Sequence, residues 1–190
     1  MRFFRLAMLV VLVGLCANCS DRRAMTSVPI PDAGEIFPSL TLDGVLSAAT
    51  VDTPATVSMA DYYDPSGARY DLLHVIGIFM WCPHCNNETS NLSTIATWQA
   101  DHRVAVVQIA MEGYGSASPT WTDLQKWVGD HNLSFPVLMD GQGAQLGQYF
   151  PVNSVPLNIV VNPRTMDVLA VEVGEVDDCQ AYEQGFLNNL

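Results

Sequence analysis

One apolar run, residues 72–80, is the strongest pattern in the chain. All of its residues except His74 are bulky, apolar or glycine, and they follow no helical period. Such a run is typical of a strand that is buried on both faces of a sheet. Residues 104–110 form a second run rich in valine. The two runs predict two buried strands, the second lying parallel in the sheet.

The rest of the chain alternates between helical and extended patterns. Apolar residues recur at helical spacing in residues 86–100 and 118–129, where Ser118 is the predicted N-cap and Pro119 the first helical residue. The other predicted elements are strands at 135–139, 157–161 and 168–173 and helices at 144–150 and 177–190, the last capped by Asp177 or Asp178. This order predicts an α/β sandwich around a mixed sheet.

Short extended pieces precede the central strand. Residues 37–42 alternate in polarity, Asp43-Gly44 predicts a turn, and residues 53–59 are extended again. Residues 60–67 predict a loop or a short turn. We assign all of these pieces to one domain, residues 35–190.

The N-terminal segment differs from this domain in composition. Two arginines flank a short apolar core at residues 6–15, which is typical of a secretory signal and short for a spanning helix. We predict a signal over residues 1–19, of either a plain exported protein or a lipoprotein modified on Cys16 or Cys19. The alternative is a hydrophobic helix that the mature domain retains. Residues 20–34 predict a flexible tether.

Composition narrows the classes of partner. The chain has 20 acidic against 8 basic residues and a formal net charge of −12. It has no basic stripe that could bind a phosphate backbone, so we expect no nucleic-acid partner. The roughly 170 residues after the signal are enough for one domain with a sizeable core.

Two cysteines follow the central strand, in the sequence Trp81-Cys82-Pro83-His84-Cys85. A helix that begins here would place the Cys82 sulfur near unpaired N–H groups and the positive end of the helix dipole, which stabilise a thiolate. Cys85, one turn further and shielded, could then resolve a mixed disulfide. Pro83 suits a first helical turn, and His84 can stabilise the thiolate further. The motif predicts thiol–disulfide exchange.

This motif after a hydrophobic strand resembles that of the thioredoxin-fold oxidoreductases. Cys-Pro-His-Cys is similar to the motif of DsbA-type oxidases, whereas its surroundings resemble the extracytoplasmic TlpA/ResA-like branch of the redoxins. The second likeness depends on the long segment before the strand, on Glu88 six residues after Cys82, and on residues 154–161. It covers residues 36–173 and implies a thioredoxin-like three-layer sandwich with an N-terminal β-hairpin extension.

The resemblance also implies roles for single residues. Pro156 corresponds to a cis-proline that faces the active-site disulfide, and Val155 before it presents its backbone to an extended substrate peptide. Trp81 corresponds to an aromatic residue packed beside the disulfide. Glu88 corresponds to a group that handles a proton for Cys85, although a first-turn Glu can equally serve the helix dipole.

The predicted enzyme is therefore an extracytoplasmic protein thiol–disulfide oxidoreductase of the periplasm or cell envelope. It requires no cofactor and no metal, because the Cys82–Cys85 pair carries the electrons. Its expected partners are cysteine-containing exported proteins and a redox partner protein, with membrane attachment only through an N-terminal lipid. The direction of exchange stays open, because the motif favours oxidation and the TlpA/ResA-like architecture favours reduction.

Two other functions would use the same cysteines. A thiol peroxidase of the redoxin group would use Cys82 on hydroperoxides, although the Thr or Ser three residues before such a cysteine is replaced by Phe79. A copper or zinc metallochaperone would bind its ion through Cys82, Cys85 and His84, because thiolates are soft ligands.

Three further positions bear on the chemistry. Thioredoxins bury an acid six residues before the first cysteine, where this chain has Ile76. Proton transfer to Cys85 must then use Glu88 or water. Cys179 stands alone near the C-terminus and is predicted to be a structural or incidental thiol. His74 is predicted not to be a ligand.

Overall fold

The structure is a computed structural model that describes residues 34–190. The predicted signal at residues 1–19, with Cys16 and Cys19, and residues 20–33 of the predicted tether lie outside the described residues. Among the helices of residues 34–190, none has the length and apolar character needed to cross a membrane.

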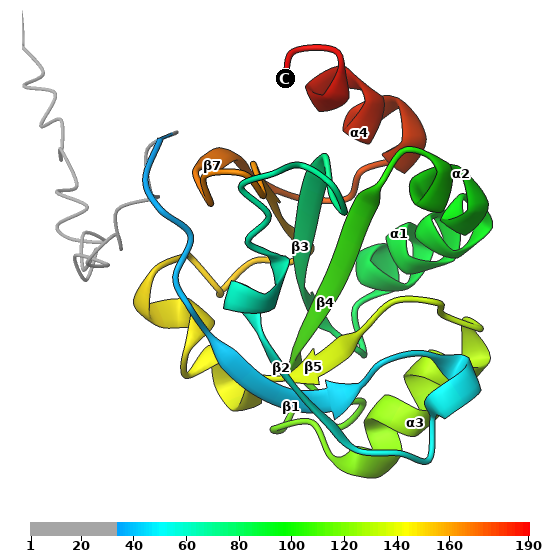
Figure 1. Ribbon diagram of the computed structural model, residues 1–190. Helices are drawn as coiled ribbons and strands as arrows, with labels where there is room; N and C mark the ends of the chain where they lie inside the picture. Colours follow the sequence, from blue (N-terminus) through cyan, green and yellow to red (C-terminus); the bar gives the residue numbers. More distant parts are fainter. Residues whose placement is uncertain (1–33) are drawn as a thin grey trace, which may run out of the picture.

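A seven-stranded mixed sheet forms the centre of the described chain (Figure 1). Its strands lie in the order β2-β1-β5-β4-β3-β6-β7. The central pair β3 and β4 is parallel, and β6 pairs with the other edge of β3 in antiparallel fashion. The strands are β1 (Thr41–Val45), β2 (Ala55–Ser58), β3 (Leu72–Phe79), β4 (Val104–Glu112), β5 (Val137–Met139), β6 (Leu157–Val161) and β7 (Val168–Val173). The two predicted buried strands, and their parallel arrangement, are confirmed.

Helices and short helical turns connect these strands. The α-helices are α1 (Pro83–Thr94), α2 (Ala96–Asp101), α3 (Trp121–Asp130) and α4 (Cys179–Leu187). The 3₁₀ turns are η1 (Ala48–Thr50), η2 (Met59–Tyr62), η3 (Gly141–Gly143) and η4 (Leu146–Gln148). The helix predicted over residues 144–150 is thus only a short 3₁₀ turn, and η2 overlaps the start of the loop predicted at 60–67.

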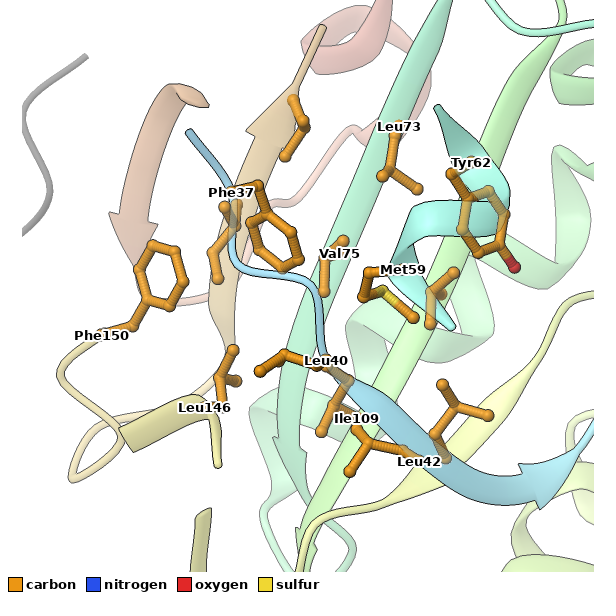
Figure 2. Close-up of a cluster of buried hydrophobic side chains, with 14 of the residues drawn as sticks. Phe37, Leu40, Leu42, Met59, Tyr62, Leu73, Val75, Ile109, Leu146 and Phe150 are labelled. Atoms are coloured by element: carbon orange, nitrogen blue, oxygen red, sulfur yellow. The ribbon is translucent and has the colours of Figure 1, made fainter. Parts of the chain in front are cut away.

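Two apolar clusters cover the two faces of the sheet. One contains buried residues of α1, α3 and α4. The other lies beneath residues 37–42, η2 and η4, and Figure 2 shows its side chains. Successive residues of a strand point to opposite faces, so Ile76 and Ile78 join the first cluster, while Leu73 and Val75 join the second. The predicted three-layer α/β sandwich is confirmed, with 3₁₀ turns and extended chain as its third layer.

The predicted N-terminal hairpin is present, but its turn lies elsewhere. Strands β1 and β2 pair in antiparallel fashion, and both Asp43 and Gly44 lie inside β1. A Cβ atom on Gly44 would overlap the carbonyl oxygen of Val137 and lie 2.7 Å from the Cα of Leu138. Gly44 therefore serves the close approach of β1 to β5 and makes no turn.

The helix predicted over residues 86–100 is two helices in the structure. The first begins at Pro83, directly after the first cysteine, and the chain leaves helical geometry at Ile95, whose φ is −103° and ψ 9°. The hydroxyls of Ser93 and Thr94 donate to backbone carbonyls three residues earlier, at 2.8 and 2.7 Å. Such local bonds compete with the helical ladder, which explains a break that apolar spacing does not reveal.

The predicted cap of α3 is wrong by two residues. Thr120, not Ser118, is the N-cap, and its hydroxyl accepts from the N–H of Asp123 at 3.2 Å. The Asp123 carboxylate accepts in return from the Thr120 N–H at 2.9 Å, which completes a capping box. For α4 the prediction is confirmed, because Asp178 accepts from the N–H of Ala181 at 2.9 Å.

Candidate active site

The end of β3 delivers Cys82 to the start of α1. The Cys82 N–H donates to the carbonyl of Phe79 at 3.0 Å, and its carbonyl accepts from the N–H of Asn86 at 3.1 Å. Cys82 is therefore the N-cap of α1, and Pro83 is the first helical residue, where a missing N–H costs no hydrogen bond. Cys82 retains 8% exposure, whereas Cys85 has none. Both cysteines are thus buried, with Cys82 slightly nearer the surface, and their roles as outer and shielded thiol stay a prediction.

Two exposed side chains of the motif each contact a carboxylate. The Trp81 ring is 47% exposed, and its N–H donates to Glu112 Oε2 at 2.6 Å. His84 Nδ1 lies 2.5 Å from Glu175 Oε2. Trp81 also stacks on Phe79, with ring centroids 5.6 Å apart. Two carboxylates thus contact exposed residues next to Cys82, and neither was among the predicted site residues.

Cys85 lies inside the apolar cluster beneath α1. Burial raises the pKa of the Cys85 thiol, opposed by a hydrogen bond to the backbone of Phe79. The neighbouring Cys82 and Glu88 raise this pKa further. Cys85 is therefore a protonated thiol at neutral pH and needs a base before its sulfur can attack.

The segment before β6 lies at the same end of the sheet as the cysteines. The Val155–Pro156 peptide bond is cis, as the resemblance implies. Val155 is half-buried and packs against the cluster that contains Cys82 and Cys85. The carbonyl of Pro156 accepts from the N–H of Gly174 at 2.9 Å.

Glu88 points into the protein from the second turn of α1. Its side chain is almost wholly buried, and Oε2 accepts from the Val176 N–H at 2.8 Å and from Asn158 Nδ2 at 3.4 Å. Among the described residues Oε1 has no hydrogen-bond partner. Burial raises the pKa of Glu88, while the Val176 hydrogen bond and the charge of His74 lower it. Because α1 begins at Pro83, the interpretation of Glu88 as a first-turn dipole residue is wrong.

A buried polar chain continues from Glu88 across the sheet. The Oδ1 atom of Asn158, on β6, lies 2.9 Å from His74 Nε2. On the other side of the ring, His74 Nδ1 lies 2.9 Å from Oε1 of Glu183, on α4. Gln99 donates to both oxygens of Glu183 at 3.0 and 3.1 Å. His74, Asn158 and Glu183 are fully buried. The sequence carried a weak signal for two of them, since His74 and Asn158 interrupt otherwise apolar strands.

The third described cysteine, Cys179, belongs to the same apolar cluster as this pair. Cys179 begins α4, its thiol donates to the Val176 carbonyl at 3.5 Å, and its N–H donates to Asn91 Oδ1 at 3.0 Å. Burial raises the pKa of its thiol. Across residues 34–190, no three His, Cys, Asp or Glu side chains are grouped so that they could hold a metal ion.

The chain was compared with known families and structures. The model of the AhpC/TSA family matches residues 33–182. A search of the curated proteins found no match.

The fold is similar to those of several solved proteins. The thioredoxin domain of a thiol-disulfide oxidoreductase from Bacteroides vulgatus is 18% identical, with 82% of this chain and 98% of that chain covered and a TM-score of 0.60. AhpC of Mycobacterium tuberculosis is 14% identical over 85% of this chain and 98% of its own, with a TM-score of 0.62. A DsbF homologue from Corynebacterium diphtheriae is 22% identical. The match covers 85% of this chain and 96% of that chain, with a TM-score of 0.58.

At these identities the structural likeness establishes the fold, and the family model establishes membership. The match spans most of the described domain, including both cysteines of the motif. The chain belongs to the AhpC/TSA family and is an oxidoreductase with the thioredoxin fold.

Proposed function

We propose that this protein exchanges disulfides with cysteine-containing proteins outside the cytoplasm through Cys82 and Cys85. One observation carries the proposal: Cys82, which retains 8% exposure, is the N-cap residue of α1, and the fully buried Cys85 follows one turn later. Helix N-terminal N–H groups favour an anionic sulfur at the cap. The Val155–Pro156 segment packs against the same cluster, and the resemblance implies that the Val155 backbone pairs with an extended substrate peptide.

The reductive half of the exchange has two steps. The Cys82 thiolate attacks a substrate disulfide, which forms a mixed disulfide and releases one substrate thiolate. The Cys85 sulfur then attacks Cys82 and passes its proton to the Glu88 carboxylate. This step forms the Cys82–Cys85 disulfide and releases the second substrate thiolate, so two electrons pass from the protein to the substrate. The reverse sequence oxidises a substrate dithiol.

Exchange with a protein disulfide tests the proposal. Cys82→Ser is expected to abolish the exchange, whereas the matched Cys179→Ser variant is expected to keep it, because Cys179 is fully buried at the start of α4 and lies outside the motif. Glu88→Gln should slow resolution of the mixed disulfide by roughly 100-fold, since a positioned base contributes about that much. Undiminished exchange by Cys82→Ser would contradict the proposal.

The equilibrium potential of the Cys82–Cys85 pair decides the direction of exchange in the cell. A value close to about −270 mV would mark a reductant, and one close to about −120 mV an oxidant. Titration against glutathione buffers, with alkylation of the remaining thiols, measures it directly.

The proposed location depends on the N-terminal sequence, which lies outside the described residues. A short apolar core after two arginines supports export to the periplasm or cell envelope. Cells that produce the Cys16→Ser or the Cys19→Ser variant are grown with a labelled fatty acid to test lipidation. Loss of the label in one variant would identify the lipidated cysteine, and an unlabelled wild-type protein would indicate plain export.

A thiol peroxidase is the second candidate, and the match to the AhpC/TSA family favours it. This function also uses Cys82, but Phe79 lies where peroxidases of the redoxin group have Thr or Ser. Consumption of hydrogen peroxide by the reduced protein separates the two candidates. No observation in residues 34–190 favours a metallochaperone, and metal content after chelator-free purification tests that function.

A further inference from the structure

The hydrogen bonds around Asn158 fix the protons of the buried chain. Asn158 Nδ2 lies 3.0 Å from the carbonyl oxygen of Gly174, which can only accept, so this atom is the amide nitrogen. The other atom, Oδ1, is therefore an acceptor and lies 2.9 Å from His74 Nε2. His74 must carry a proton on Nε2.

The opposite side of the His74 ring needs a second proton. His74 Nδ1 lies 2.9 Å from Glu183 Oε1, and two acceptors at that distance would repel each other unless one of them holds a proton. Burial by itself would lower the pKa of His74, but the hydrogen bond and charge of Glu183 outweigh it, so the pKa is raised. We take the pair as an imidazolium hydrogen-bonded to Glu183, whose two side-chain oxygens both accept from Gln99.

This ion pair ends the chain that begins at the resolving cysteine. The imidazolium donates to Asn158, and Asn158 donates to Glu88 Oε2 at 3.4 Å. The other ionisable groups that face Glu88 are Glu175 from the β7–α4 loop, Cys179 and Tyr182 from α4, and Cys85 on its own helix. Among the groups that influence Glu88, His74 alone carries a positive charge.

We propose that His74, held by Glu183, is the buried cation that keeps Glu88 ready to accept the proton of Cys85, acting through Asn158. The inference rests on the proposed function. His74 is a positioning residue, because it touches neither sulfur nor substrate. The resemblance to thioredoxins implies a buried acid at the position that is Ile76 here; the polar partners of Glu88 come instead from β6 and, beyond His74, from α4.

A single-turnover reaction separates the two steps. The reduced full chain, with Cys16, Cys19 and Cys179 replaced by serine, is mixed with dithiobis-nitrobenzoate in a stopped-flow instrument. Attack by Cys82 releases one coloured thiolate, and resolution by Cys85 releases the second. Only the second phase requires Glu88, and its rate should rise with pH as Glu88 ionises.

The variant His74→Gln with Glu183→Gln removes both charges and keeps groups that can hydrogen-bond. We expect the pH midpoint of its second phase to rise by about one unit, which slows resolution about tenfold below the midpoint, with the first phase unchanged. Glu183→Gln alone should shift the midpoint in the same direction and serves if the double variant does not fold. An unmoved midpoint in the folded variants would overturn the proposal.

A neighbouring buried network provides the matched control. Gln108 donates to the Thr89 hydroxyl at 2.7 Å and accepts from the Trp127 N–H at 3.0 Å, without contacting Glu88. Gln108→Met should leave the pH midpoint of the second phase unchanged. If Gln108→Met shifts this midpoint as much as the His74 variants do, the effect of His74 is only structural. If Cys85→Ser fails to remove the second phase, the proposed exchange mechanism fails. If it removes the phase and the midpoint stays fixed in the His74 variants, only the role of His74 fails.

Discussion

The two cysteines of the motif lie one helical turn apart in the same apolar cluster, but the polar groups near each of them differ. Beside Cys82 in the motif, Trp81 and His84 are exposed, and each contacts one carboxylate, Glu112 or Glu175. Cys85 is fully buried, and the polar groups behind it form a chain through three further elements of the fold. The comparison suggests a division of tasks: the outer half meets the substrate, and the buried half controls a proton.

The largest difference between the halves should appear in alkylation. Iodoacetamide added to the reduced, native protein is expected to modify Cys82 and to leave Cys85 and Cys179 unmodified, because among the cysteines of residues 34–190 only Cys82 retains exposed surface. Peptide mass spectrometry measures the label at each site, and denatured protein serves as the control in which all three react. Equal labelling of Cys85 in the native protein would contradict the described burial.

The buried half should tolerate the loss of one charge poorly. His74→Leu leaves the Glu183 carboxylate without its cation in a fully buried site. We expect the free energy of unfolding to fall by about 3–5 kcal/mol, measured by denaturant titration. His74→Leu combined with Glu183→Leu should recover most of the loss, since an apolar pair replaces both charges. A single variant as stable as the double one would show that no buried ion pair exists.

Glu88 should link the stability of the fold to pH. Burial raises the pKa of Glu88 above its value of about 4.3 in the unfolded chain. The contribution of Glu88 to the free energy of unfolding is therefore complete below a pH of about 4.3 and is lost as pH rises through the folded pKa. Glu88→Gln should therefore gain stability relative to the native protein as pH rises toward neutrality. Unfolding titrations across this range measure the difference, and a pH-independent difference would contradict it.

The outer half should select weakly for charge. Cystamine, a cationic disulfide, is expected to react with Cys82 about threefold to tenfold faster than the anionic oxidised glutathione, with the advantage falling as salt is added. Combined Glu112→Gln and Glu175→Gln substitutions should lower the ratio of the cystamine rate to the glutathione rate. Comparing this ratio between the variant and the native protein cancels the intrinsic reactivity of the two reagents. A ratio of rates that changes neither with salt nor with these substitutions would rule out charge selection.

The sequence predicted the outer half far better than the buried one. The run at residues 72–80 and the motif after it are local patterns, so the strand and the approach of a helix N-terminus to the motif could be inferred, although the helix begins three residues earlier than predicted. Glu183 is 109 positions from His74, and no local pattern shows that the terminal helix brings it there. Glu175 likewise reaches His84 only after β7 has paired with β6.

The roles of the two thiols can be tested by trapping the mixed disulfide. Reduced Cys85→Ser protein is incubated with a disulfide-containing protein substrate and examined by mass spectrometry without reductant. We expect a stable covalent complex through Cys82, which disappears in the Cys82→Ser, Cys85→Ser double variant. A complex that forms equally well in the double variant, or no complex while Cys85→Ser still completes the exchange, would contradict the account.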